Sequence, residues 1–129
     1  MEYLASGFKD VDNTADFTKY ANCLNFLHTL KFFRKYKDDI HQMLALNNGL
    51  RVLDVGCGLG NDLIDMAGAI GPDGVATGVD SSEALLEIAD RNIKNGPGNI
   101  ELVKGDALNL NFDDNSFDRC KIDRTLQHI

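Results

Sequence analysis

The pattern of apolar positions changes near residue 49. Before it, residues 15–46 contain neither proline nor glycine, and apolar side chains recur at three- and four-residue spacings, which is the pattern of one helical face. That face comprises Phe26, Leu30, Phe33, Ile40 and Leu44. Asn13-Thr14 suits the start of a helix and Asn48-Gly49 its end. Because one helix of this length is unusual, we expect a break between Lys37 and Asp39.

After residue 49, short apolar runs alternate with helical stretches. Strands are predicted at residues 51–55, 75–79, 100–103 and 117–123, and helices at 61–70 and from Ser81 or Ser82 to about residue 94. The buried stripe of the second helix is Leu85, Ile88, Ala89 and Ile93. This alternation predicts an α/β fold with a doubly wound parallel sheet. We divide the chain into a helical extension, residues 1–48, and an α/β domain, residues 49–129.

The first predicted strand ends in three alternating glycines, Gly56, Gly58 and Gly60. Without a Cβ, these residues can take positive φ and let a ligand approach the backbone at a helix start. Asp54 lies inside the apolar run of the strand, where an acid requires a polar partner. The loop therefore predicts a binding site for a nucleotide-like molecule.

In a parallel sheet of this kind, ligands bind at the carboxyl ends of the strands. Asp80 ends the second strand, 20 residues after Gly60, and its two oxygens could accept both hydroxyls of a ribose. Asp106 follows the third strand and could accept from a purine amine, while Asp123 and Arg124 follow the fourth. Three acids beside a glycine loop suit a ligand with an adenosine part and a cationic part.

Four segments together resemble class I S-adenosylmethionine-dependent methyltransferases. They are Val-Leu-Asp-Val-Gly-Cys-Gly-Leu-Gly at 52–60, Gly-Val-Asp-Ser-Ser at 78–82, Gly-Asp-Ala at 105–107 and Asp-Asn-Ser-Phe-Asp at 114–118. The closing residues 123–129 also look like the segment that follows strand four in this family. The chain is most similar to the small-molecule branch that includes the ubiquinone and menaquinone enzymes. The family's sheet has seven strands and four are found here, so the resemblance implies an incomplete, N-terminal part of a Rossmann-like methyltransferase fold.

The resemblance implies S-adenosylmethionine as cofactor and a small-molecule methyl acceptor. It assigns a cofactor-binding set: Asp54, Gly56, Cys57, Gly58, Asp80, Ser81, Asp106, Ala107 and Arg124. In it the loop backbone faces the amino acid part, Asp80 holds the ribose, and Asp106 with Ala107 holds the adenine. Ser81 stands beside the adenine, where the family often has a bulkier apolar residue, so stacking there should be weak. No catalytic base is assigned; Tyr20, His28 and Tyr36 are candidates for the acceptor wall.

Several of these residues also have structural explanations. Asp80 could cap the next helix, and Asp106 could close a turn. We expect Cys57 to be a small apolar filler rather than a reactive thiol, and His128 to be structural rather than a base. The segment Lys31-Phe-Phe-Arg-Lys-Tyr-Lys37 mixes bases with aromatic residues, and we interpret it as a helix with a buried Phe face and a solvated basic face rather than as an RNA site.

Charge and cysteine content narrow the class of protein. Twenty acids against 13 bases give a net charge of −7, which argues against a general nucleic-acid surface. Three cysteines without a CxxC pair indicate reduced thiols in a cytoplasmic protein, with neither a disulfide framework nor a metal site. No apolar stretch is long enough for a membrane span, and the N-terminus does not read as a signal peptide.

Two alternative functions stay open. An NAD(P)-dependent oxidoreductase would also use glycines and Asp80, although the G-x-G-x-G spacing and the acid inside strand one argue against it. A non-catalytic S-adenosylmethionine-binding fragment is favoured by the missing strands. Arg119, Lys121 and Asp123 share one face of strand four, and we interpret them as charges that protect an exposed edge, through which the chain could associate with itself or with a partner.

Overall fold

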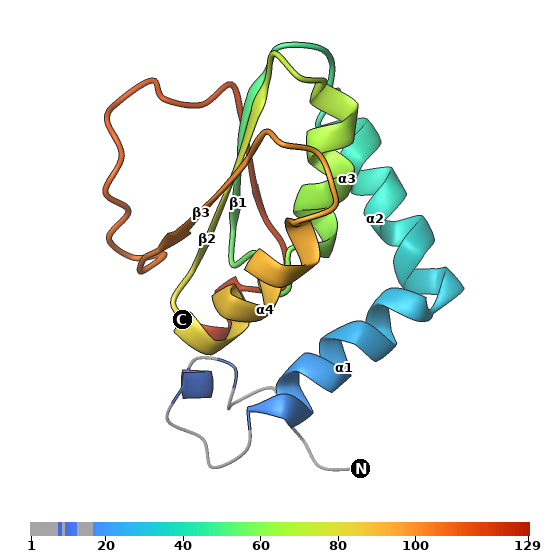
Figure 1. Ribbon diagram of the computed structural model, residues 1–129, viewed down its shortest axis with the longest axis vertical. Helices are drawn as coiled ribbons and strands as arrows, with labels where there is room; N and C mark the ends of the chain where they lie inside the picture. Colours follow the sequence, from blue (N-terminus) through green and yellow to red (C-terminus); the bar gives the residue numbers. More distant parts are fainter. Residues whose placement is uncertain (1–7, 9, 13–16) are drawn as a thin grey trace.

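A single four-stranded parallel sheet forms the centre of the molecule in a computed structural model that describes residue 8, residues 10–12 and residues 17–129 (Figure 1). The strands are β1 (Arg51–Val55), β2 (Val75–Asp80), β3 (Ile100–Lys104) and β4 (Arg119–Ile122). Their order is β3-β2-β1-β4, and every pairing is parallel. The chain therefore moves outward from β1 to β3 and then crosses back to the other side of β1, which confirms the predicted parallel α/β fold.

The helices are α1 (Thr18–Thr29), α2 (Lys31–Met43), α3 (Asn61–Ile70) and α4 (Glu83–Ile93), followed by a short 3-10 turn at Leu126–His128. The predicted break between Lys37 and Asp39 is wrong, because the helical extension breaks at Leu30, whose ψ is 130°. Just before it, the Thr29 hydroxyl donates to the carbonyl of Phe26 at 2.7 Å, a local bond that competes with helix continuation. The predicted start at Asn13-Thr14 lies outside the described residues.

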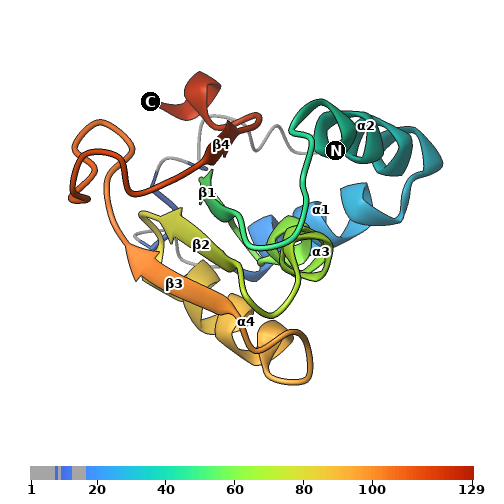
Figure 2. The ribbon, with the colours of Figure 1, turned by 90° about the horizontal axis from the view of Figure 1, so that it is seen from above.

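An apolar layer joins the sheet to α3 and α4, which lie side by side on one face of it (Figure 2). Leu63, Met66 and Ile70 of α3 are fully buried against Val52 and Ala76 of the sheet. At the start of α4, the Ser82 hydroxyl accepts from the Leu85 N–H at 3.1 Å, which confirms a serine cap. This layer fixes both helices by burial of apolar surface.

The opposite face of β1 and β2 is covered by an irregular segment rather than by a helix in the described part of the chain. Leu53, Val55 and Val79 project there. Phe112 and Phe117 pack on them, with their rings perpendicular and their centroids 5.0 Å apart. The segment between β3 and β4 therefore forms a second, smaller apolar core, which holds its first residues at the end of the sheet.

Strand β4 is polar on the side that faces the helices. Arg119 donates from Nε to the carbonyl of Leu44 at 2.8 Å, and Lys121 is only 5% exposed. In the described sheet β4 is an edge strand, as expected. The interpretation of Arg119, Lys121 and Asp123 as charges that protect this edge is wrong, because these side chains bond to neighbouring helices and loops. Among the helices of the described chain, none is long and apolar enough to cross a membrane.

Candidate functional site

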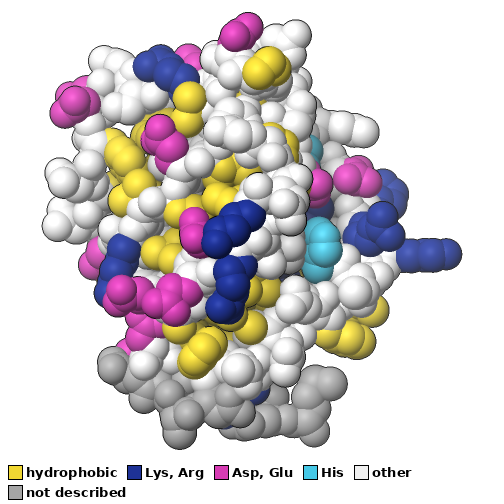
Figure 3. All heavy atoms as spheres, in the orientation of Figure 1, with side chains coloured by type: hydrophobic (Ala, Val, Ile, Leu, Met, Phe, Trp, Pro, Cys, Tyr) yellow, Lys and Arg dark blue, Asp and Glu magenta, His cyan; other side chains and the backbone are white. Residues whose placement is uncertain are grey.

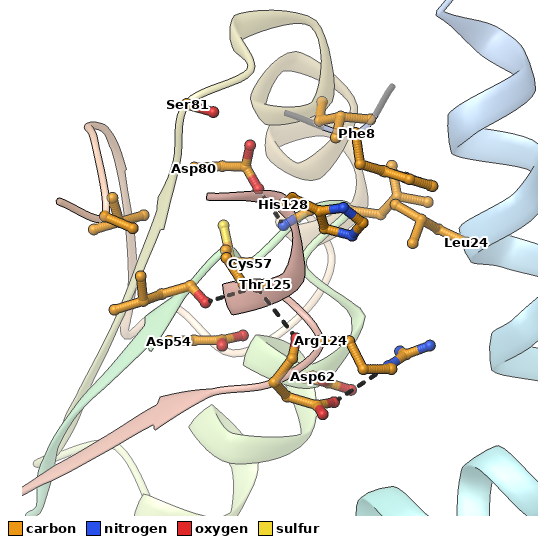
Figure 4. A pocket seen from close by; sticks show the side chains of 18 of the residues that line it. Phe8, Leu24, Asp54, Cys57, Asp62, Asp80, Ser81, Arg124, Thr125 and His128 are labelled. Carbon is orange, nitrogen blue, oxygen red and sulfur yellow. Dashed lines mark hydrogen bonds and ion pairs between the residues drawn. The ribbon is translucent and has the colours of Figure 1, made fainter. Parts of the chain in front are cut away.

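A cavity of about 1100 Å³ opens at the carboxyl ends of β1 and β2, beside the point where the strand order reverses (Figure 4). Ligands of open α/β sheets bind at this place. Figure 4 shows Asp80 and Ser81 at one end of the pocket, Asp54, Asp62 and Arg124 at the other, and Cys57 and Thr125 between them. The volume of the cavity is at the upper end of the ~300–1,000 Å³ typical of ligand sites.

The glycine loop brings its backbone to the wall of this cavity. Gly56 and Gly58 have φ of 79° and 54°, a region that other residues rarely adopt. At Gly56 there is also no room for a side chain, because a Cβ would lie 2.1 Å from the Thr125 hydroxyl oxygen. Glycine is therefore required here by conformation and by contact.

The amides of this loop point into the protein. The N–H groups of Gly56 and Cys57 both donate to the Val79 carbonyl, at 2.7 and 3.0 Å, and the Gly58 N–H donates to Asp80 Oδ2 at 2.9 Å. A phosphate-binding loop needs such N–H groups directed at the ligand. This loop instead offers close approach to a ligand without phosphates.

Asp80 is held in place by two backbone donors. Its Oδ2 accepts from Gly58 N–H, and its Oδ1 accepts from Ser82 N–H at 2.9 Å. Burial raises the pKa of Asp80 despite these two hydrogen bonds. The side chain is half-buried and lines the cavity. The two interpretations of this residue are thus compatible, since the carboxylate that organises the start of α4 also faces the site.

Asp106 and Ala107 follow β3 and line the cavity, and the Gly105 N–H just before them donates to the Asp80 carbonyl at 3.0 Å, which brings this segment next to Asp80. The exposed Asp106 side chain accepts from the Leu108 N–H at 2.9 Å, so the predicted turn-closing role is confirmed. Its carboxylate still lines the cavity. Cys57 is buried, and burial raises its pKa well above the usual range of a thiol, which confirms the expected filler role over a reactive one.

A buried charged cluster forms the other end of the cavity: Tyr36, Lys37, Asp54, Asp62, Lys121 and Asp123. Lys121 is the neighbour of Asp54 across the β1–β4 pairing, with Nζ 3.6 Å from Asp54 Oδ1 and 2.5 Å from Asp62 Oδ2. The acid inside strand one thus has the partner that its position requires. The sequence contained half of this information, because Asp54 interrupts an apolar strand, whereas Lys121 stands in a strand that carries other charges.

Helix α2 joins this charged cluster from the opposite side. Lys37 bridges Asp62 at 2.6 Å and Asp123 at 2.5 Å, and the Tyr36 hydroxyl donates to Asp123. The sequence did not identify Lys37, Asp62 and Lys121 as residues of the site. For Lys37 and Asp62 the reason is that a helical pattern does not show which charged residue turns inward.

The two acids nearest Lys121 have opposite shifts. Burial raises the pKa of Asp54 to about 6, against the attraction of Lys121. Burial alone would also raise the pKa of Asp62, but the charges of Lys121 and Lys37 outweigh it and lower the pKa to about 2. At neutral pH the charged cluster therefore holds ionised acids whose charges are compensated by buried lysines.

Arg124 lies between this charged cluster and the cavity. Its φ is 52°, its guanidinium stands 4.8 Å from the centre of the Phe33 ring, and its Nε is 3.6 Å from Asp123 Oδ2. That Nε is buried and has no hydrogen-bond partner among the described residues. A left-handed, non-glycine residue with an unsatisfied donor at a cavity is typical of a functional position.

An apolar wall completes the cavity opposite the sheet. Figure 4 shows Phe8, Leu24 and His128 along this side. The Phe8 ring lies 5.3 Å from the His128 ring and 4.9 Å from the Tyr20 ring. Tyr20 is 5% exposed and supports Phe8 from behind. The sequence had no pattern that placed residues before 15 at the site.

All nine residues of the predicted cofactor-binding set line this one cavity. Of the three acceptor-wall candidates, His28 lines it, whereas Tyr20 lies behind Phe8 and Tyr36 binds Asp123. The described residues contain no group of His, Cys, Asp and Glu that could hold a metal ion.

Comparison with known proteins agrees with this arrangement. Residues 52–129 match the model of a family described as methyltransferase domain. The chain is 35% identical over 107 residues to a demethylmenaquinone methyltransferase of Geobacillus kaustophilus, covering 82% of this chain and 46% of that protein. The chain therefore spans less than half the length of this curated relative.

Solved structures show the same fold. A SAM-dependent methyltransferase from Thiobacillus denitrificans, in complex with S-adenosyl-L-homocysteine, is 29% identical, with a TM-score of 0.57, 68% of this chain covered and 35% of that one. A SAM-dependent methyltransferase from Aquifex aeolicus is 22% identical, with a TM-score of 0.64. The match covers 94% of this chain and 57% of that protein, and it shows a likeness of fold. With its residues 52–129 matched and its cavity at the expected edge of the sheet, the chain belongs to the methyltransferase-domain family.

Proposed function

We propose that the chain is the cofactor-binding part of an S-adenosylmethionine-dependent methyltransferase that acts on a small-molecule acceptor. The observation that carries this proposal is Asp80, whose carboxylate is fixed by Gly58 and Ser82 N–H groups while it lines the cavity. A carboxylate held in this way can accept both hydroxyls of a ribose without first reorganising.

The residues around Asp80 fit the rest of the cofactor. Asp106 and Ala107 would hold the adenine beside Ser81, because all three line the cavity next to Asp80. The backbone at Gly56 and Gly58 would lie against the amino acid part, and the Nε of Arg124, which makes no hydrogen bond among the described residues, could donate to its carboxylate. Cys57 and Asp54 would support the loop from within.

The inward-pointing amides argue against the oxidoreductase alternative. A dinucleotide places its pyrophosphate on N–H groups at a helix start, but those of Gly56, Cys57 and Gly58 are already bonded within the protein.

The acceptor would lie against the apolar wall. Phe8, Leu24 and Phe33 line it, which suits an acceptor with a ring or an apolar tail, and the relative named demethylmenaquinone methyltransferase supports this class. When bound, S-adenosylmethionine supplies an activated methyl group for in-line displacement. The protein would contribute alignment and exclusion of water, worth up to ~7–11 kcal/mol in favourable cases.

The location and assembly of the protein belong to the same proposal. Cys23, Cys57 and Cys120 are free thiols, which supports a cytoplasmic location. In the described sheet β4 pairs with β1 alone, so its other edge is where further strands, of this protein or of a partner, would add.

Calorimetry with S-adenosylhomocysteine and with NAD tests this function. We expect binding of the first and none of the second. Asp80→Asn should weaken binding by about 10- to 150-fold, since it removes a charge-assisted hydrogen-bond acceptor. Asp90→Asn, on the exposed side of α4, is the matched control and should leave affinity unchanged. Binding of NAD without binding of S-adenosylhomocysteine would show the proposal to be wrong.

A further inference from the structure

A basic corner stands out where α1 meets α2: Phe26, Lys31, Phe32, Arg34 and Lys35. Phe26 is 58% exposed and Phe32 is 76% exposed, so the buried Phe face expected for residues 31–37 is wrong for Phe32. Only Phe33, on the inner side of α2, is half-buried. Single exposed apolar residues need no explanation, but these two flank one hinge and are interleaved with bases.

The charge of this basic corner is opposite to that of the chain. Residues 31–37 contain four bases and no acid, in a protein of net charge −7. Lys37 turns inward to the charged cluster, whereas Lys31, Arg34 and Lys35 are exposed. Lys35 bonds Asp39 at 3.2 Å, but this exposed pair is weak. A local positive surface therefore remains available to an anionic partner.

The shape of the basic corner restricts the kind of partner. In Figure 1, α1 and α2 meet at a projecting angle on the right of the molecule. Figure 3 shows Lys and Arg side chains extending from this side, with hydrophobic side chains below them. A projecting surface with aromatic tips and basic flanks resembles interfacial membrane anchors, in which rings enter the headgroup region and bases contact lipid phosphates.

We propose that the basic corner docks on the surface of an anionic phospholipid bilayer. Phe26 and Phe32 insert between headgroups, and Lys31, Arg34 and Lys35 contact the phosphates. Single-stranded RNA is the weaker candidate, because its bases stack on aromatic platforms within a groove, whereas these rings stand on a projecting angle.

The basic corner is continuous with the cavity. Phe26 lines the cavity and is also exposed to solvent. Phe32 contacts Phe33 edge-on at 5.5 Å, and Phe33 in turn lines the cavity and meets Arg124. If the proposed function holds, docking would place the cavity mouth at the lipid surface, so that an acceptor with an apolar tail can enter without crossing water. The docking itself does not depend on methyl transfer.

Flotation with vesicles, in the absence of any cofactor, tests the docking. We expect the chain to float with phosphatidylcholine vesicles that contain about one third phosphatidylglycerol, and only weakly with pure phosphatidylcholine. Lys31→Gln/Arg34→Gln should weaken partition about 25-fold, at about fivefold per base. Phe26→Ser/Phe32→Ser should weaken it at least about tenfold, through loss of apolar insertion.

Matched variants separate docking from general charge or loss of folding. Arg91→Gln/Lys94→Gln removes two exposed bases near the end of α4, and Met43→Ser removes a side chain that is 79% exposed at the far end of α2. Both should float like the unchanged chain, and circular dichroism should show all variants folded. Equal losses in these controls, unchanged flotation of either corner variant, or no flotation at all would overturn the proposal. The proposal would also be overturned if the chain bound poly(U) in preference to vesicles and Lys31→Gln/Arg34→Gln abolished the binding of poly(U).

Discussion

Two parts of the same helix-facing side of the sheet are built in opposite ways. Under α3 and α4, the strands present Val52 and Ala76 to fully buried leucine, methionine and isoleucine side chains. Under α2, neighbouring positions present Asp54 and Lys121 to other charged groups, and α2 itself has no buried residue. Val52 and Asp54 lie only two positions apart in β1, so the change from an apolar to a charged interface occurs within one strand.

The two interfaces hold their helices in different ways: the apolar one makes α3 rigid, and the charged one sets the position of α2. Apolar burial is non-directional and strong in sum, and it fixes α3 and the glycine loop that begins it. Charged hydrogen bonds are directional, and they fix the angle of α2 over the cavity through a few atoms. The apolar interface under α3 would therefore be insensitive to pH, whereas the α2 side would respond to it.

The largest effect is expected from breaking the charged cluster. Lys121→Met leaves the buried Asp54 without its cross-strand partner, and removal of one partner of a buried pair costs ~3–5 kcal/mol. Urea unfolding followed by circular dichroism measures the loss in the free energy of unfolding.

A second substitution in the same pair provides the control. Lys121→Met/Asp54→Leu replaces both charges with apolar groups and should recover most of that loss, since Asp62 keeps Lys37. A single variant within about 1 kcal/mol of the unchanged chain, or a double variant no better than the single, would contradict a coupled buried pair.

The apolar side should show a slightly smaller loss with no pH dependence. Leu63 is fully buried in α3, and Leu63→Ala should cost ~2–5 kcal/mol through lost transfer energy and the cavity left behind. The loss should be equal at pH 5 and pH 8 in urea unfolding, and Leu63→Met should cost less than about 1.5 kcal/mol. A loss that varied with pH would mean that the two interfaces are not independent.

The pKa shifts predict a pH dependence of stability on the charged side. The folded pKa of Asp54 is about 6, above the ~3.9 of an unfolded aspartate, so the folded state holds this proton more tightly. Its contribution to stability is therefore favourable at low pH and declines as pH rises from about 4 to 6, by ~2 kcal/mol. Asp62 has the opposite sign: its pKa of about 2 contributes stability above pH ~4 that is lost as pH falls toward 2.

Asp54→Asn isolates the first of these two effects. Because asparagine resembles the protonated acid, the variant should gain in stability relative to the unchanged chain as pH rises from 4 to 7. Urea unfolding of both proteins across this range gives the difference directly. A constant difference would show that Asp54 stays ionised throughout, against the raised pKa.

The apolar interface under α3 and α4 could be predicted from the sequence to a larger extent than the charged interface under α2. The strands, α3, α4 and the serine cap follow from periodicity and turn residues, because apolar burial leaves a repeating pattern. The residues around the cavity were predicted from their place at the strand ends and from the resemblance to the family. The angle between α1 and α2 could not be predicted, since Leu30 looks like any other apolar helical residue. The roles of Lys37 and Lys121 were also hidden, because a charged residue looks alike in sequence whether it is solvated or paired. Lys121 was distinguished only by sharing one face of its strand with Arg119 and Asp123, a pattern that also fits an exposed edge.

The smallest effect should come from the outermost bond of the charged cluster. Tyr36→Phe removes the hydroxyl that donates to Asp123 and leaves Lys37 in place, so we expect a loss of ~1 kcal/mol. Hydrogen exchange should locate this loss in α2, whose amides would exchange about fivefold faster, with α3 unchanged. Lys35→Ala breaks an exposed pair on the same helix and should cost at most ~0.5 kcal/mol. If instead α3 loses protection as much as α2, then the charged and the apolar parts of this sheet face unfold together, and α2 is not positioned separately from the cofactor end.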